Sequence, residues 1–145
     1  MKIGLVRHFK VNHQFPDKIF LSKTEVIKWF VEYDKTENIQ HKNVDLYEID
    51  WKRCYLSTMI RAVNTANHIY SGEIVKITEL QELDIIHCLP DRMKLPFILW
   101  GLIIRIKSYS SNNSTDKFRN EIIAFVDKII ANDKCDILIV SHWFV

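Results

Sequence analysis

Short apolar runs that alternate with segments of helical periodicity constrain the fold of this chain more than any other feature. The runs lie at residues 2–7, 53–56, 73–78 and 136–141. Each run is too short for a helix, and its apolar, β-branched character is typical of strands in a covered sheet. Strands that alternate with helices predict an α/β fold with a mostly parallel central sheet and helices on both faces, a three-layer αβα sandwich.

Capping and breaking residues predict where the intervening helices begin and end. The predicted starts are a capping box at Ser22 and Glu25, a cap at Ser57 or Thr58, an apolar helix initiated by Pro96, and Asp116. The first helix ends in the polar stretch 34–38, the second runs to about Tyr70, and residues 110–115 form a polar loop. The last helix is expected to place six apolar residues on one face: Phe118, Ile122, Phe125, Val126, Ile129 and Ile130.

Composition limits the partners and the compartment that we expect. The 145 residues, 48% of them hydrophobic, fit one domain over residues 1–145 with its own core. The chain has 20 Lys and Arg and 18 Asp and Glu, so its net charge is small. A net charge of this size gives no reason to expect nucleic acid or an anionic membrane surface as a partner. The stretch 95–104 is too short to span a bilayer and the N-terminus lacks a secretory signal, so we expect a cytoplasmic protein. Cys54, Cys88 and Cys135 are expected as reduced thiols.

The residues that follow the carboxyl ends of the predicted strands are polar or basic. They are Arg7 and His8 after the first strand, Ser57, Thr58 and Arg61 after the second, and Ser141 and His142 after the last. Because ligands bind beyond the carboxyl ends of parallel strands, we expect these side chains to converge. Two guanidiniums and two imidazoles facing one point repel each other unless an anion lies between them. Phosphate suits this arrangement, since its oxygens accept hydrogen bonds from forked arginine donors.

Four segments resemble the histidine phosphatase superfamily, which has the phosphoglycerate mutase-like fold. They are LVRHF at 5–9, LSTMIRAVNTA at 56–66, LQE at 80–82 and IVSH at 139–142, and they occur in the family's order. Residues 94–119 are also similar to the variable cap of a less-characterised bacterial branch of that superfamily. The resemblance therefore implies one histidine phosphatase domain with a variable cap or insert at 83–115.

The resemblance implies a metal-independent phosphatase without a cofactor. In the family reaction the first histidine, here His8, takes up the phosphoryl group as phosphohistidine, which water then hydrolyses. Arg7, Arg61 and a protonated His142 would bind the phosphoryl oxygens. The substrate class is a phosphorylated small molecule or a phosphorylated protein side chain, and the oligomeric state is left open.

The proton for the leaving group comes, in the family, from the acidic residue of the Leu-x-Glu element. Matching LQE assigns that role to Glu82. Glu79 lies three residues earlier and also follows the third predicted strand, so it is the rival for the same role. Both stay open at this point, with Glu82 preferred.

This chain departs from the family pattern beside both histidines. Phe9 and Trp143 stand where the family has glycine, and Val11 and Gln14 replace a threonine and an asparagine. Bulk next to the pocket would reshape it, so Phe9, Gln14, Ser57 and Trp143 are candidate substrate-contacting residues. The chain ends soon after its second histidine with an apolar tail, and we expect a C-terminal segment to be missing beyond it.

Three alternatives to a phosphatase remain. The first is a phosphoglycerate mutase-like phosphotransferase, which the short length disfavours. The second is a catalytically weak phosphate-binding or interaction module. The bulky Phe9 and Trp143 beside the pocket favour this alternative, because they stand where the family has glycine. The third is a zinc site made of His8, His13 and His142, which the flanking arginines oppose because they repel a dication.

Overall fold

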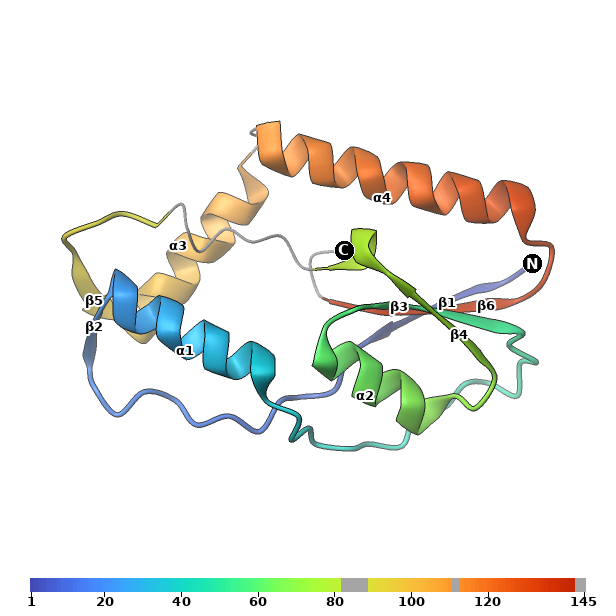
Figure 1. Cartoon of the computed structure of the whole chain (residues 1–145), viewed down its shortest axis with the longest axis horizontal. Helices are drawn as coiled ribbons and strands as arrows, with labels where there is room; N and C mark the ends of the chain where they lie inside the picture. Colours follow the sequence, from blue (N-terminus) through green and yellow to red (C-terminus); the bar gives the residue numbers. More distant parts are fainter. Residues whose placement is uncertain (82–88, 111–112, 143–145) are drawn as a thin grey trace.

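A four-stranded parallel sheet forms the centre of the computed structural model, which describes residues 1–81, 89–110 and 113–142 (Figure 1). The strands lie in the order β1 (Ile3–Arg7), β6 (Ile137–Ser141), β3 (Arg53–Ser57) and β4 (Glu73–Ile77). All three neighbouring pairs are parallel. The four strands predicted from the sequence and the α/β class are therefore confirmed.

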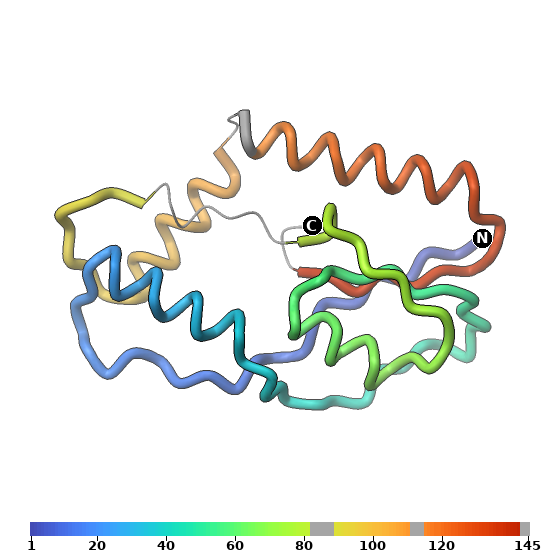
Figure 2. The backbone as a smooth tube through the Cα atoms, in the orientation of Figure 1, coloured from blue at the N-terminus to red at the C-terminus, as the bar shows by residue number. Residues whose placement is uncertain are grey.

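The first and last of these strands come from opposite ends of the chain and lie side by side (Figure 2). Their register pairs Arg7 with Ser141 at the carboxyl end. At the same end β3 closes with Ser57. This pairing brings the residues that follow β1 and β6 to one edge of the sheet.

Helices pack on both faces of the sheet. α2 (Ile60–Ile69) covers one face, where it builds a core from Cys54, Leu56, Ala62, Ala66, Leu138 and Val140. α4 (Asn113–Asn132) lies on the other side, where Tyr55, which points opposite to its neighbours in β3, contacts Phe125 with ring centroids 5.6 Å apart. This contact does not extend to β1, whose Leu5 is 78% exposed. Small residues on α2 let it lie close to the strands. Gly4 of β1 makes room for the Trp51 ring on this sheet, since a Cβ there would meet that ring at 2.8 Å.

A second packing unit lies beyond the carboxyl ends of the strands (Figure 1). It consists of α1 (Lys23–Lys35), α3 (Phe97–Tyr109) and the short antiparallel pair β2 (Phe20–Ser22) and β5 (Lys94–Pro96). Leu21, Val26, Leu89 and Trp100 form its core. The buried Trp100 indole donates to the Leu21 carbonyl at 2.9 Å, which joins α3 to β2.

Helix starts were predicted with mixed success. The capping box at Ser22 and Glu25 is confirmed, with both reciprocal hydrogen bonds present. The cap predicted for α2 at Ser57 or Thr58 is wrong, because Met59 is the N-cap and no side chain caps the helix. Ser57 is the last residue of β3, and the helix begins three residues later; its hydroxyl accepts from the Met59 amide at 3.4 Å, before the first turn of α2.

Two expectations for the chain before and along α4 are also corrected. The predicted loop at 110–115 is wrong for residues 113–115, because α4 already begins at Asn113. Ile130 is half exposed and does not share the buried face with Ile129. Two of the cysteines can be located: Cys54 is fully buried as a free thiol and Cys135 is partly buried, whereas Cys88 lies outside the described residues.

One 3-10 turn, η1 (Thr78–Leu80), follows β4 and was not predicted from the sequence. Its last residue, Leu80, is buried, and its carbonyl accepts a hydrogen bond from the Ser141 hydroxyl at 2.8 Å. The turn thereby fastens the segment after β4 to the end of β6. Of the helices in the described part of the chain, none has the length and apolarity that crossing a bilayer requires.

Candidate functional site

His8 and His142 meet at the carboxyl edge of the sheet. Each follows directly after its strand, and the His8 amide donates to the Ser141 carbonyl at 3.0 Å, which extends the β1–β6 ladder by one residue. The two imidazole rings lie with centroids 5.0 Å apart and planes inclined by 56°. The convergence of the two histidines predicted from the strand ends is therefore observed.

The His8 ring is held in one tautomer by its own neighbourhood. Its Nδ1 lies 2.7 Å from the Phe9 carbonyl oxygen. A carbonyl only accepts, so Nδ1 carries the proton of the neutral ring and Nε2 presents a lone pair. Burial lowers the pKa of His8 to about 4, the Phe9 carbonyl opposes that shift, and the charges of Arg61 and Arg7 add to it. At neutral pH His8 is an uncharged imidazole.

His142 is almost fully buried between the sheet edge and the start of the α2 segment. Its Nε2 lies 2.8 Å from the Ser57 hydroxyl oxygen, and its buried Nδ1 has no hydrogen-bond partner among the described residues. Burial, followed by the charges of Arg61, His8 and Arg7, lowers the pKa of His142 to about 3. Without a bound anion the ring is therefore neutral at pH 7, chiefly because it is buried and secondly because of the nearby guanidiniums. The protonated His142 expected during phosphoryl transfer concerns the phosphate-bound site and stays a prediction.

Arg61 supplies the buried positive charge of the site. It lies in the first turn of α2 with 2% of its surface exposed. Its Nη1 donates to the Asp34 carboxylate at 2.6 Å, and its guanidinium carbon lies 5.3 Å from the centroid of the Tyr33 ring. Arg7 is exposed at the end of β1, yet its charge acts on both histidines. We refer to Arg7, His8, Arg61 and His142 as the imidazole–guanidinium cluster.

Thr65 ties this cluster together through the backbone. Its buried hydroxyl accepts from the Phe9 amide at 2.9 Å and donates to the Arg61 carbonyl at 2.7 Å. The first hydrogen bond fixes the residue whose carbonyl orients His8. The second hydrogen bond lies within α2, the helix to which Arg61 belongs. The threonine of the RAVNTA segment thus couples β1 to α2.

The Phe9 side chain packs into the core instead of widening or blocking the site. The ring is 6% exposed and belongs to a core cluster with Val11 and Ile39. It also meets the His41 and His68 rings edge-on, with centroids 6.2 and 5.7 Å away. Phe9 therefore contributes backbone atoms to the site, and its bulk fills a hydrophobic cluster between the first loop and α2.

The other candidate substrate-contacting residues have different positions. Ser57 is buried and contacts His142, as described. Gln14 is exposed on the loop after β1, and its carbonyl accepts a hydrogen bond from the Trp29 indole at 2.9 Å. Trp143 lies outside the described residues.

Of Glu79 and Glu82, the two candidates for the proton donor, the described residues include Glu79. Glu82 lies outside the described residues. Glu79 is exposed in η1, where its own backbone amide and the Thr78 hydroxyl hold the pKa of its carboxyl below the ordinary value. A carboxyl that ionises so readily keeps its proton poorly, which disfavours Glu79 as a general acid.

Sequence reasoning missed Asp34 and the role of Thr65. Asp34 belonged to the polar stretch predicted to end the first helix, and nothing local distinguishes it from its charged neighbours. Only the packing of α1 beside α2 brings its carboxylate to Arg61. Thr65 was noted within RAVNTA, but its two hydrogen bonds depend on the position of Phe9.

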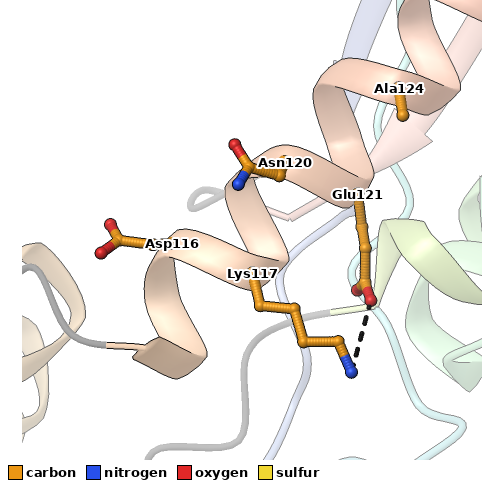
Figure 3. A pocket seen from close by; sticks show the side chains of 5 residues that line it. All are labelled: Asp116, Lys117, Asn120, Glu121 and Ala124. Atoms are coloured by element: carbon orange, nitrogen blue, oxygen red, sulfur yellow. Dashed lines mark ion pairs between the residues drawn. The ribbon is translucent and has the colours of Figure 1, made fainter.

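Two other features of the surface do not compete with this site. His13 contacts the Thr36 hydroxyl at 3.2 Å, and within residues 1–81, 89–110 and 113–142 no three His, Cys, Asp or Glu residues are arranged to hold a metal ion. A depression on α4 is lined by Asp116, Lys117, Asn120, Glu121 and Ala124 (Figure 3). The lysine and glutamate of that lining form an i,i+4 ion pair at 3.7 Å, as on an ordinary solvated helix face.

Comparison of the chain with family models, with curated proteins and with solved structures finds no match. Two neutral imidazoles next to a buried guanidinium and a second one at the surface form an arrangement that attracts a multivalent oxyanion. The same arrangement offers that anion a nucleophilic nitrogen.

Proposed function

We propose that this chain is a phosphatase that hydrolyses a phosphomonoester through a phosphohistidine on His8. The observation that carries the proposal is the state of this ring: it is neutral, its Nδ1 is bound to the Phe9 carbonyl, and its Nε2 lone pair is available beside two guanidiniums. A nucleophile for phosphorus needs that lone pair and a positively charged environment.

The reaction follows from the groups of the imidazole–guanidinium cluster. His8 Nε2 forms a bond to phosphorus while the bond from phosphorus to the ester oxygen breaks. Arg61 and Arg7 stabilise the charge on the phosphoryl oxygens, and His142 Nδ1 can bind one of them. The leaving oxygen takes a proton from an acid, a role we assign to Glu82 by resemblance. Water then attacks phosphorus and releases His8 and inorganic phosphate.

Bound phosphate also changes the protonation of His142. An anion next to a neutral imidazole favours its charged form, so phosphate binding raises the pKa of His142 from its value of about 3. We therefore assign the protonated His142 that the family resemblance implies to the phosphate-bound site. Phosphate binding is then accompanied by proton uptake at mildly acidic pH.

The proposal includes the finer features of the fold and the setting. We assign the domain to the phosphoglycerate mutase-like three-layer αβα fold, with residues 83–115 as a variable cap. The substrate is a phosphorylated small molecule or protein side chain, and the protein acts in the cytoplasm without a metal, nucleic acid or membrane. The four ordered sequence segments and the parallel order of β1, β6, β3 and β4 support these assignments.

Hydrolysis of an aryl phosphate by purified protein tests the proposal. We expect turnover in the presence of a chelator, loss of turnover in His8→Gln, and no change in His41→Gln, which alters an exposed histidine. Arg61→Ala should lower kcat/KM about a hundredfold, since removing one preorganised donor costs about 3 kcal/mol, whereas Arg119→Ala should not.

The alternatives appear as distinct outcomes of the same assay. Phosphate binding with wild-type turnover no faster than that of His8→Gln would indicate a binding module and would overturn the phosphatase. Transfer between phosphoglycerates without net hydrolysis would indicate the mutase-like phosphotransferase.

A further inference from the structure

Asp34 brings a negative charge to a site that otherwise attracts anions. It lies in the last turn of α1, and its Oδ1 is 2.6 Å from Arg61 Nη1. The guanidinium is almost fully buried, with 2% of the side chain exposed, whereas 40% of the Asp34 side chain is exposed. The contact is a charge-assisted hydrogen bond of short length, in a setting where one partner is shielded from water.

This contact fixes the direction of the guanidinium. A guanidinium is planar, so holding one terminal nitrogen at the Asp34 carboxylate and placing the plane near the Tyr33 ring limits the rotation of the whole group. Both constraints come from neighbouring residues of α1. The orientation of Arg61 therefore depends on the end of one helix, although the residue itself belongs to another.

The same contact weakens the field that a bound phosphate experiences. Two guanidiniums act on His8 and His142, and the Asp34 carboxylate offsets one of these charges at hydrogen-bond distance. A phosphate dianion bound to Arg61 lies close to this carboxylate and is repelled by it. The repulsion applies to product phosphate as well as to the ester.

We propose that Asp34 is a positioning residue of the phosphatase site, which orients Arg61 for phosphoryl transfer and limits how tightly inorganic phosphate is retained. This inference rests on the proposed function. Asp34 would then have two separable effects. Its hydrogen bond orients Arg61 and so affects kcat, whereas its negative charge affects the affinity for phosphate. A site without the carboxylate would bind product more tightly and release it more slowly.

The affinity for inorganic phosphate, measured by calorimetry at low and high salt, tests the charge effect. Asp34→Asn keeps the size of the side chain and an oxygen that can accept from Arg61, but removes the charge. We expect it to bind phosphate about five to ten times more tightly than the wild type at low salt, and the difference to shrink at high salt. The matched control is Glu32→Gln, which removes an exposed charge from the same helix, paired with Lys28 at 3.9 Å.

The kinetics of aryl phosphate hydrolysis test the orientation effect. In Asp34→Asn both KM and kcat should fall, whereas a change that only impaired folding would lower the apparent kcat and leave KM unchanged. Asp34→Glu keeps the charge and shifts its position, so phosphate affinity should stay within about twofold and kcat should fall at least fivefold. This second variant keeps the inference testable if Asp34→Asn does not fold.

Several results would overturn the inference. Phosphate affinity in Asp34→Asn equal to that of Glu32→Gln, or weaker than in the wild type, would contradict the charge effect. An unchanged kcat in Asp34→Glu would contradict the orientation effect. If the wild type neither binds phosphate nor hydrolyses the ester, the proposed function fails together with the inference. If the wild type does both and the Asp34 variants behave like it, only the inference fails.

Discussion

Acidification from pH 7 to pH 5 should destabilise the folded protein through the two histidines of the site. In the folded protein the pKa of His8 is about 4 and that of His142 about 3, below the ordinary value of 6.5. The unfolded chain therefore binds protons on these rings as the pH falls through 6.5, and the folded chain does not. Because the unfolded state binds more protons, the free energy of unfolding decreases with falling pH.

The size of this loss follows from the two pKa values. At pH 5 each histidine is mostly protonated in the unfolded chain and mostly neutral in the folded one, which corresponds to about 2 kcal/mol per residue relative to pH 7. The two residues together give about 4 kcal/mol, a large part of the stability of a domain of this size. Glu25, whose pKa is lowered to about 2, stays ionised in both states over most of this interval and contributes little.

Urea unfolding at the two pH values measures the loss. We expect the difference between pH 7 and pH 5 to fall to about half in His142→Gln and almost to vanish in His8→Gln/His142→Gln. Added phosphate should reduce the loss in the wild type, because an anion favours the charged rings. An equal loss in the wild type and the double variant, or no loss at all, would refute the argument that these rings are buried and neutral.

Three further predictions concern individual contacts. Thr65→Val leaves a buried backbone amide without its acceptor, so it should lower the free energy of unfolding by about 1–3 kcal/mol and slow aryl phosphate turnover; unchanged urea unfolding would contradict this. Glu82→Gln should abolish hydrolysis of an alkyl phosphate, whose leaving group is poor, and Glu79→Gln should not; loss in the second variant alone would reverse the assignment. Trp100→Phe removes the buried hydrogen bond to Leu21 and should cost about 1–3 kcal/mol in urea unfolding with the phosphate affinity unchanged; a cost under about 0.5 kcal/mol would contradict the importance of that bond.

The central sheet could be predicted from the sequence because each strand has a local apolar signal, although only β6 is buried along its whole length. Each is a short apolar run next to a helix signal, and parallel strands need such intervening helices. Convergence of His8 and His142 followed from the same reasoning, since residues after parallel strands meet at one edge.

In the second packing unit the two helices could be predicted from the Ser22–Glu25 capping box and from Pro96, but the strand pair could not. Strands β2 and β5 have three residues each, too few for an alternating pattern to be distinguished, and they pair across more than 70 residues of chain. The contact of Trp100 with Leu21 depends on that pairing.

Details of the site depended on tertiary packing as well. Phe9 was expected to crowd the pocket because glycine is usual there, but the backbone turns its ring into a core cluster. The helix start after β3 was misplaced because Ser57 still belongs to the strand, where it pairs with Ile77 and its hydroxyl contacts His142. In both cases a residue 30 or more positions away determines the role of the side chain.

Chemical trapping of the phosphoenzyme tests the central claim most directly. The protein is mixed with labelled aryl phosphate, quenched rapidly in alkali to preserve phosphohistidine, and digested for peptide mapping. The proposed mechanism predicts label on His8 in the wild type, formed no more slowly than the steady-state turnover, and none in His8→Gln. Label on another residue, or turnover without label on His8, would contradict it.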